Sequence, residues 1–387
     1  MSQSEIVIVG VGIVSPLGCS SASVASKLIR GQSGIRKRAL RRGSTPVLSA
    51  LVPVSTKQVS IKGWPMSRTA ALASLAATAA LKDAGLVQAN ECGGLGIIHA
   101  SAHGNLHSLI EYENQLQQYG LDYASPLGFP NTLLHATSGF LSMQFGAAAF
   151  NITIADEASS SLDALEMASQ LLKAGAAQSV LCVAAEELSA EMFALLKTDE
   201  ALEAEFPDPF GERRRGYVPA EGAVACVLET RSTAKLRGHR VLASCRGYAS
   251  ISGFSAKRIP GLLRDGLAAA EVRPDELGCV MASGNGSLQD AVEAEAVAQV
   301  CGSQVPVTSV KGAFGECGAP SALLSAAALM ICSRRALCPP TVGRSSYDPS
   351  LPALDLLREP APMRTPLALI NAVNSDLACA ALVLELT

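Results

Sequence analysis

The sequence predicts an α/β fold in which two similar βαβ halves form one compact body. Short apolar, strand-like runs alternate along the chain with amphipathic or alanine-rich stretches of helical spacing, a pattern typical of this fold class. Hydrophobic residues make up 49% of the chain but aromatic residues only 4%, so small and branched aliphatic side chains must fill the interior. Residues 151–168 and 305–328 share one outline: a strand leads through small residues into an alanine-rich helix.

These patterns predict individual strands and helices and a boundary between the halves near Thr230. An acidic-ended strand gives way there to RSTAKLRGHR, which divides the chain into 1–230 and 231–387. The predicted strands cover 6–11, 94–100, 151–155, 179–185, 222–229, 279–283, 305–310, 366–373 and 378–386. The predicted helices cover 68–86, 162–175, 290–301 and 321–332.

Charge and cysteine usage exclude several classes of function. With 31 basic and 34 acidic residues the net charge is −3, which gives no field to attract nucleic acid or an anionic membrane. The 11 cysteines are odd in number and form no C-x-x-C pair, so we expect neither a disulfide framework nor a metal site of the zinc type. The sequence opens without a signal-peptide pattern and has no apolar run long enough to span a bilayer, which predicts a cytoplasmic protein.

Two short motifs invite a functional interpretation. GVGIVSPLG (10–18) begins like a dinucleotide fingerprint, but Ser15 stands where the third glycine is needed and no suitably placed acidic residue follows, so we expect no nucleotide site. The basic run RKRALRR (36–42) predicts a solvated loop. Docking of an acidic carrier protein is the alternative for this run.

The segment ITIADEASSS (152–161) has the form of a nucleophile turn, in which a strand ends and the chain bends into a helix. IVIVGVGIVSPLG (6–18), GQSGI (31–35) and DPFGERRRGYVPAEGAVACVLE (208–229) also stand in an order that resembles the β-ketoacyl synthase family of fatty-acid and polyketide assembly, over essentially the whole chain. The resemblance implies a layered αβαβα fold of the thiolase superfamily, dimeric through a strand near 151–155. It also implies no cofactor beyond the phosphopantetheine of an acyl carrier protein, which carries the substrates.

The residues that perform the family's condensation are absent from the matching positions. The family uses a cysteine at the bend to take an acyl chain, and two histidines of the second half stabilise the malonyl enolate and the developing oxyanion. Here Ala158 occupies the cysteine position, while Ser283 and Glu316 occupy the histidine positions. The chain has 5 histidines and none follows His239, so no realignment supplies an imidazole to the second half. The resemblance therefore implies no independent activity, because a methyl group cannot form an acyl-enzyme.

Other positions of the former site are partly retained. In the segment that matches the family's C-terminal oxyanion loop, Asn374, Asp376 and Leu377 stand where the family has glycines, and larger side chains there cost strain or fill space. An aspartate there would also repel an enolate. We interpret the retained residues as structural supports of the former site; they are Glu221, Lys311, Asn371 and Ser375.

With these departures, the sequence is most similar to the chain-length factor, the ketosynthase β-subunit of type II polyketide systems. The resemblance implies a heterodimer with an active ketosynthase, whose acyl tunnel this chain would close in polyketide, polyene or fatty-acid-like biosynthesis. Asn105, Ser108 and Tyr112 share one face of an expected helix at 103–116, and Tyr112 is a candidate floor of the tunnel; ordinary dimer packing is the alternative. The candidate tunnel residues are Asn105, Ser108, Tyr112, Leu133, Leu134 and Phe140.

Two other functions remain open. Malonyl-carrier-protein decarboxylases that generate starter units also lack the cysteine, but they retain histidines that this chain does not have. A serine-dependent acyltransferase would use Ser159, Ser160 or Ser161 as the nucleophile. A simpler interpretation is that Ser160 or Ser161 caps a helix that begins at Leu162. The candidate bases for a serine nucleophile are Asp156, Glu157, His103 and His135.

Overall fold

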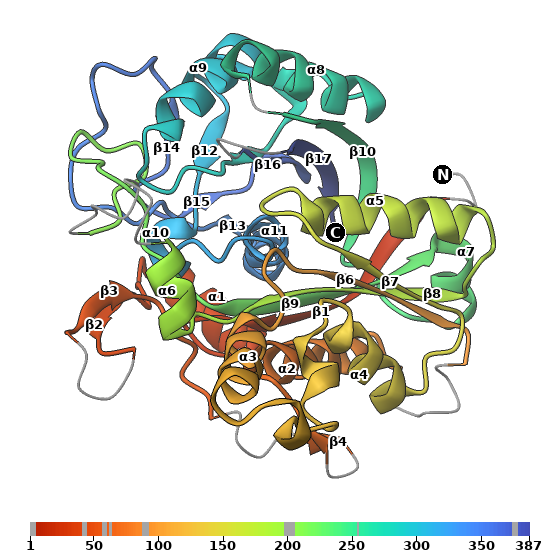
Figure 1. The fold of residues 1–387 in the computed structure, drawn as a ribbon. Helices are drawn as coiled ribbons and strands as arrows, with labels where there is room; N and C mark the ends of the chain where they lie inside the picture. Colours follow the sequence, from red (N-terminus) through yellow and green to blue (C-terminus); the bar gives the residue numbers. More distant parts are fainter. Residues whose placement is uncertain are drawn as a thin grey trace.

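The chain forms two β-layers with helices between them and on both outer faces, in the order αβαβα (Figure 1). The computed structural model describes residues 5–40, 45–55, 60–61, 64–86, 93–196, 206–253, 255–373 and 378–387. The two β-layers meet where Val7 pairs with Ser244 and Ile8 with Ala243, which makes them one continuous, bent sheet. The predicted layered α/β fold is thus confirmed.

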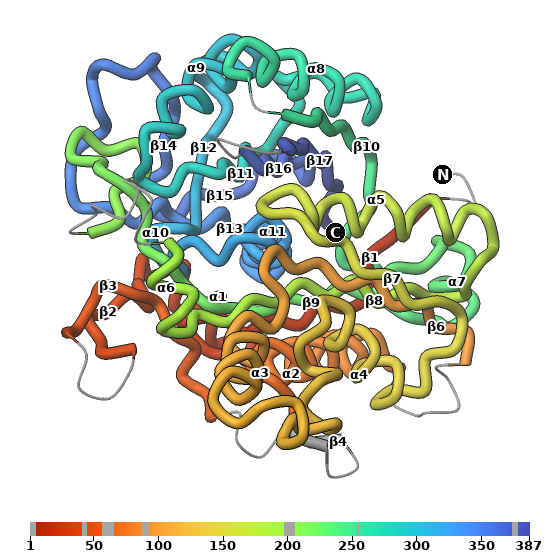
Figure 2. Tube along the Cα trace, in the orientation of Figure 1, coloured from red at the N-terminus to blue at the C-terminus, as the bar shows by residue number. Residues whose placement is uncertain are grey.

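In the first half, five strands pair in the order β1–β9–β8–β6–β7. The pairs β1–β9 and β9–β8 are antiparallel, whereas β8–β6 and β6–β7 are parallel. Figure 2 shows the N-terminal strand β1 beside β9, which is the last strand of this half in the sequence. The strands are β1 (Ile6–Val14), β6 (Leu95–Ala100), β7 (Phe150–Ile154), β8 (Ser179–Glu186) and β9 (Gly222–Thr230).

The second half repeats this topology strand for strand. The pairs β10–β17 and β17–β16 are antiparallel, β16–β11 and β11–β12 are parallel, and β14 adds a further edge strand beside β12. Neighbouring strands pair antiparallel or parallel in the same order in both halves. The repeat predicted from two segments therefore extends to the whole topology. The strands are β10 (Ala243–Ile251), β11 (Cys279–Met281), β12 (Pro306–Thr308), β14 (Asp355–Leu356), β16 (Leu367–Ala372) and β17 (Cys379–Leu386).

Two helices form the middle layer and place their N-termini at the same end of the molecule. α5 (Ser160–Lys173) and α11 (Ser321–Ser333) lie between the β-layers, whereas α2 (Arg68–Asp83) and α8 (Ile259–Ala269) cover the outer faces (Figure 1). In α11, 12 of the 13 residues are buried, which its alanine-rich, uncharged sequence allows on every side. The segments leading into α5 and α11 are therefore brought together.

Every predicted strand and helix is present, with ends shifted by at most three residues. The patterns missed the long strand β10, the helices α1, α4, α6, α7, α8 and α10, and the short strands β2, β3, β4, β5, β13, β14 and β15. The remaining helices are α1 (Ser21–Ile29), α3 (Leu106–Tyr119), α4 (Ala136–Phe145), α6 (Ala190–Leu196), α7 (Arg231–Leu236), α9 (Gln289–Cys301) and α10 (Lys311–Phe314). Short strands form the pairs β2 (Arg36–Arg38) with β3 (Val47–Ser49), β4 (Ser60–Ile61) with β5 (Trp64–Pro65), and β13 (Leu337–Cys338) with β15 (Ala361–Pro362).

Glycines in β1 and β10 let the outer helices approach the strands closely in both halves. A Cβ atom on Gly12 would lie 2.0 Å from the Ala76 carbonyl oxygen, and one on Gly10 would lie 2.3 Å from that of Ala80, both in α2. A Cβ atom on Gly247 would lie 2.4 Å from the backbone at the end of α8. The two glycines of the apparent nucleotide motif thus serve helix packing.

Replacing Gly12 with alanine should lower the free energy of unfolding by about 3 kcal/mol, because the backbone of α2 must move away. Gly261→Ala in α8 is the matched control, since a Cβ atom there meets nothing within 4 Å. Alanine favours a helix more than glycine does, so the free energy of unfolding of the control should rise by about 0.5–1 kcal/mol. Urea unfolding followed by circular dichroism measures both changes. Wild-type stability of Gly12→Ala would contradict the close packing.

Candidate functional site

A cavity of about 620 Å³ brings the three substituted positions together. Ala158 comes from the bend between β7 and α5, Ser283 follows β11, and Glu316 lies in the loop between α10 and α11. All three residues line the cavity wall. The cavity therefore needs both halves of the chain, as the resemblance implied.

The bend after β7 presents a methyl group to the cavity. Ala158 lines the wall and is 7% exposed. Just before it, Asp156 Oδ1 accepts a hydrogen bond of 2.7 Å from the Glu157 N–H, which stabilises the turn. The position that holds a thiol in the family thus carries no nucleophilic atom.

The predicted helix cap at Ser160 or Ser161 is wrong, because α5 begins at Ser160, two residues before Leu162. The Ser160 hydroxyl donates to the Glu157 carbonyl oxygen at 2.7 Å. The Ser161 hydroxyl accepts from the Leu323 N–H of α11 at 3.3 Å. Burial in the middle layer explains the difference, since these hydroxyls bond to adjacent segments instead of capping the helix.

The hydroxyls of the serine-acyltransferase alternative do not line the cavity. Ser159 and Ser160 are fully buried, and Ser159 Oγ donates to Asp163 Oδ2 at 2.8 Å. Of the two candidate histidines, His103 lines the cavity and His135 is exposed before α4. Burial lowers the pKa of His103. Because none of the three serines lines the cavity, the structure gives this alternative no support.

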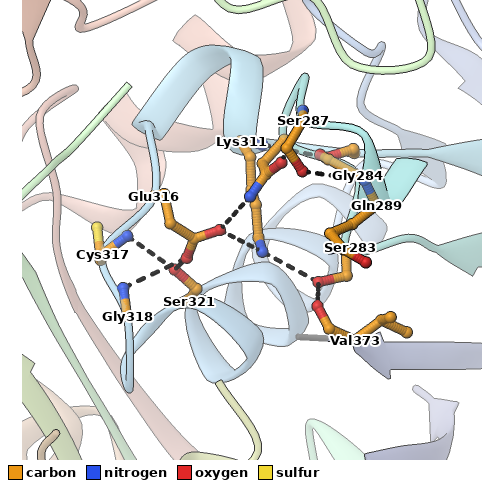
Figure 3. Close-up of polar contacts among 12 residues, drawn as sticks. Ser283, Gly284, Ser287, Gln289, Lys311, Glu316, Cys317, Gly318, Ser321 and Val373 are labelled. Atoms are coloured by element: carbon orange, nitrogen blue, oxygen red, sulfur yellow. Dashed lines mark hydrogen bonds and ion pairs between the residues drawn. The ribbon is translucent and has the colours of Figure 1, made fainter. Parts of the chain in front are cut away.

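Lys311 joins the two positions of the family's histidines through one buried ammonium group (Figure 3). Its Nζ donates to Ser283 Oγ at 3.0 Å and to Glu316 Oε2 at 2.7 Å. Ser283 Oγ in turn donates to the Val373 carbonyl oxygen at 3.1 Å. The Lys311 and Glu316 side chains are 5% and 15% exposed, so the ion pair is largely removed from water.

Glu316 accepts hydrogen bonds on both carboxylate oxygens. Asn285 Nδ2 donates to Oε2 at 2.9 Å, while Ser321 Oγ and the Gly318 N–H donate to Oε1 at 2.5 and 3.3 Å. Burial by itself raises the pKa of Glu316, but Lys311 and the hydrogen-bond donors outweigh burial and hold the pKa below its usual value. The group is therefore an anion at neutral pH, and it opposes any negative charge that develops in the cavity.

Four more buried carboxyl groups line the cavity, and the sequence analysis missed them; they belong to Glu186, Glu187, Asp290 and Glu293. Burial raises the pKa of Glu186 and of Glu293 to about 7, and that of Asp290 to about 6, although backbone N–H donors act in the opposite direction. Each lies within or beside an apolar or alanine-rich run of the sequence. An acidic residue in such a run was the sequence signal that could have identified these groups, because buried carboxyl groups need specific partners.

The retained Asn371 lies directly behind the first substituted histidine position. Glu293 Oε1 accepts from the Ser283 N–H at 2.8 Å and from Asn371 Nδ2 at 2.9 Å. Asn371 is 1% exposed and thus belongs to the buried wall of the site. The other predicted residues of this loop lie outside the described residues; they are Asn374, Ser375, Asp376 and Leu377.

Glu221 is buried beside the cavity and paired with an arginine of α2. Arg68 Nε donates to Glu221 Oε2 at 2.8 Å, and Arg68 NH2 donates to Oε1 at 2.5 Å. The Val52 N–H also donates to Oε1, at 2.8 Å. A bidentate, charge-assisted pair holds both side chains in a fixed geometry. These contacts agree with a supporting role for Glu221, which stays a prediction.

The candidate tunnel residues are absent from the described residues that line this cavity. Asn105 precedes α3, and its Oδ1 accepts from Ser67 Oγ at 2.6 Å. The Tyr112 and Phe129 rings pack with centroids 6.0 Å apart, and Phe140 is buried against α2. Ser108 and Leu133 are half-buried, and Leu134 is 46% exposed. Their place in a tunnel stays a prediction.

The surface features expected from composition can be followed on most of the chain. Arg36 and Lys37 of the basic run are exposed, but Arg36–Arg38 form the strand β2 instead of the predicted loop, while residues 41–42 lie outside the described part. Within the described ranges, no cluster of three or more histidine, cysteine or acidic side chains could hold a metal ion. In those same ranges no helix combines the length and apolarity needed to cross a membrane.

The family follows from comparison with known proteins. Residues 3–234 match the β-ketoacyl synthase N-terminal domain, and residues 235–344 match the C-terminal domain. The chain belongs to the β-ketoacyl synthase family. The resemblance inferred from residues 6–18, 31–35 and 208–229 is thereby confirmed.

Similar proteins within the β-ketoacyl synthase family include both synthases and a β-subunit. The β-subunit of the tetracenomycin polyketide synthase ketoacyl synthase of Streptomyces glaucescens is 28% identical over 96% of each chain. The 3-oxoacyl-(acyl-carrier-protein) synthase 2 of Rhizobium meliloti is 26% identical over 87% of this chain and 88% of its own. The structure of the ishigamide ketosynthase/chain length factor matches over 99% of each chain, with a TM-score of 0.90 and 23% identity. At that identity the structural likeness shows the fold.

Replacing Glu293 with glutamine should remove a pH-dependent loss of stability. Between the usual pKa of 4.5 and the folded-state pKa of about 7, the folded chain binds more protons than the unfolded chain, so stability falls as the pH rises. Glutamine does not ionise. The free energy of unfolding of the variant should therefore rise relative to that of the wild type, by up to about 3 kcal/mol between about pH 4.5 and 8.

Urea unfolding across this pH range measures the difference between the two proteins. Glu295→Gln, on the exposed side of α9, is the control and should leave the pH dependence unchanged. A difference between Glu293→Gln and wild type that stays constant with pH would contradict the raised pKa of Glu293.

Proposed function

We propose that the chain is a subunit of the chain-length-factor type. It performs no condensation itself, pairs with an active ketosynthase and shapes that enzyme's acyl tunnel, in a type II polyketide system or a related polyene or fatty-acid-like pathway. The observation that carries this proposal is the Lys311 ammonium group, which bonds to Ser283 and Glu316 at the positions where the family has two histidines.

The chemistry of the cavity wall supports the absence of condensation. The Ala158 methyl group cannot attack a thioester. A neutral imidazole donates a hydrogen bond to a thioester oxygen, but the Ser283 hydroxyl donates instead to the Val373 carbonyl. The Lys311 charge is balanced by Glu316 within the protein, so little of it is left to stabilise an enolate. The same reasons disfavour the decarboxylase alternative.

An exposed apolar surface beside a free sheet edge supports pairing with a second chain. β7 ends the strand order and pairs with β6 alone among the described strands. α4 contacts β7, and η3 (Phe129–Thr132) contacts both α4 and α3, so the surface is continuous. Patches of this kind mark protein interfaces. Of the 12 large apolar side chains that are exposed in the described part of the chain, eight lie here: Leu109, Tyr119, Leu121, Tyr123, Leu127, Phe129, Leu134 and Met143.

This surface also contains the candidate floor of the tunnel. Tyr112 packs against Phe129, which is 51% exposed, and so lies where a partner chain would cover it. The similar proteins described as a ketoacyl synthase β-subunit and as a ketosynthase/chain length factor point to the same kind of partner. We further propose that substrates arrive on the phosphopantetheine of an acyl carrier protein with no other cofactor, that 1–230 and 231–387 are the two halves of one body, and that the protein is cytoplasmic.

Leu121→Glu should weaken the heterodimer. Leu121 is 83% exposed within the proposed interface, and a charge there must be desolvated when the partner binds. Leu236→Glu is the matched control, because Leu236 is 89% exposed but lies on α7, away from this surface. Each variant is co-expressed with a tagged ketosynthase from the same gene neighbourhood, and the bound fraction is measured.

We expect one-to-one recovery of the wild type and of Leu236→Glu. For Leu121→Glu we expect a dissociation constant at least tenfold larger, a loss of about 1.4 kcal/mol of binding free energy. Failure of the wild type to bind any such ketosynthase would contradict the proposed function. Equal binding of both variants would contradict the proposed interface.

Restoring a thiol alone should not restore condensation. Ala158→Cys places a sulfur in the cavity wall, but Ser283 and Glu316 still offer no imidazole to a malonyl thioester. We expect two-carbon extension to stay at the background rate, measured by mass spectrometry of the carrier-bound product. Ala164→Cys, buried in α5 away from the cavity, is the control for adding a thiol. Extension by the Ala158→Cys chain alone would contradict the proposal.

A further inference from the structure

The surface proposed above for pairing with a ketosynthase contains no lysine or arginine. This pairing surface is made by α3, η2 (Leu121–Tyr123), η3, α4 and β7, and it spans residues 106–154. The chain has 31 lysine and arginine residues, but residues 83–172 contain none of them. No element of the pairing surface therefore brings a permanent positive charge to it.

The permanently charged side chains of the pairing surface are acidic. Glu111 and Glu113 are exposed on α3, and Asp122 is exposed in η2. Asp122 lies between Leu121 and Tyr123 in the chain, and these two side chains are 83% and 76% exposed. Within the described ranges, neither Glu113 nor Asp122 forms an ion pair. A partner that covers the exposed apolar side chains must therefore also meet unpaired carboxylates.

Two histidines on the pairing surface do not balance these carboxylates. His107 Nε2 lies 3.5 Å from Glu111 Oε1, and its Nδ1 lies 3.1 Å from Glu191 Oε2, so any charge on this imidazole is matched by two carboxylates. His135 is exposed just before α4. One further imidazole against the two unpaired carboxylates leaves the surface negative at neutral pH.

The free edge of the sheet on the pairing surface lacks the usual protection. Exposed strand edges of soluble proteins are commonly protected by charged side chains or proline, or are covered by another segment. β7 has the sequence FNITI, with neither a charge nor a proline. Asn151 Nδ2 donates to the Ser138 carbonyl oxygen at 2.8 Å and to Ser142 Oγ at 2.6 Å, which fixes this edge to α4. The edge and the apolar surface beside it are therefore suited to being covered together by one partner.

A second copy of this chain would bring the same charges to the interface. In a two-fold symmetric pair, one patch meets the identical patch of the other copy. Three carboxylates from each copy would then lose water without gaining a cation, and like charges held together oppose association. A partner that carries lysine or arginine at the matching places gains attraction from the same groups.

We propose that the pairing surface selects its partner by charge. It fits a ketosynthase surface that carries lysine or arginine opposite Glu113 and Asp122, and it disfavours a second copy of this chain. This inference rests on the proposed heterodimer and adds the chemical character of the partner's surface. The apolar side chains supply area to be buried, while the carboxylates decide which chain is accepted.

Reversing the two unpaired charges should weaken binding of a tagged ketosynthase from the same gene neighbourhood. For Glu113→Lys/Asp122→Lys we expect a dissociation constant at least tenfold larger than that of the wild type at about 50 mM salt. The difference should shrink at about 500 mM salt, because salt screens exposed charges. Asp265→Lys/Glu295→Lys, exposed on α8 and α9, changes the net charge equally and should bind like the wild type.

Melting curves confirm that each variant is folded, so a loss of binding is not a loss of structure. Equal binding of wild type and the folded Glu113→Lys/Asp122→Lys chain would overturn the charge selection and leave the proposed function standing. A wild type that binds no ketosynthase would contradict the proposed function, and self-association then decides the charge selection by itself.

Self-association tests the charge selection without a ketosynthase. Wild type and Glu113→Lys/Asp122→Lys are given different tags and mixed in equal amounts, and mixed pairs are compared with pairs of two differently tagged wild-type chains. At about 50 mM salt we expect at least tenfold more mixed pairs, because an acidic surface then meets a basic one. Equal recovery of mixed and wild-type pairs would overturn the proposal.

Discussion

The buried ion pair between Lys311 and Glu316 is the interaction on which the site depends. Taking both charges out of water is costly, and the pair is tolerated because Ser283, Asn285 and Ser321 complete its hydrogen bonds. The same network fills the positions where the family places imidazoles. One set of contacts therefore stabilises the second half of the cavity wall and, on the proposed function, leaves it without the imidazole donors that condensation requires.

The duplicated topology explains why this network faces Ala158. Each half runs from a strand through a short bend into a helix of the middle layer, and both bends lie at one end of the molecule. Close packing at Gly12 and Gly247 holds the outer helices in matching places. The fold thus forms a cavity of about 620 Å³ from both halves of the chain, and on our proposal the family's reactive groups are absent from its wall.

Most strands could be predicted because they are buried on both faces and read as continuous apolar runs. β10 could not, because Arg246 and a bulge at Gly247 interrupt its pattern. The start of α5 was misplaced because Ser161 bonds to α11, a contact invisible to local patterns. Motif alignment placed Ala158, Ser283 and Glu316 in one site, but only the folded chain shows that Lys311 joins the last two.

The most direct test measures carrier-bound product and released CO₂ when the purified chain meets an acyl-carrier substrate and a malonyl carrier. The measurement is made with the chain alone and again with its partner ketosynthase added. We predict background levels of both signals for the chain alone, and extension once the partner is present, because the reactive thiol and imidazoles come from the partner. Two-carbon extension or malonyl decarboxylation by the chain alone would contradict this prediction.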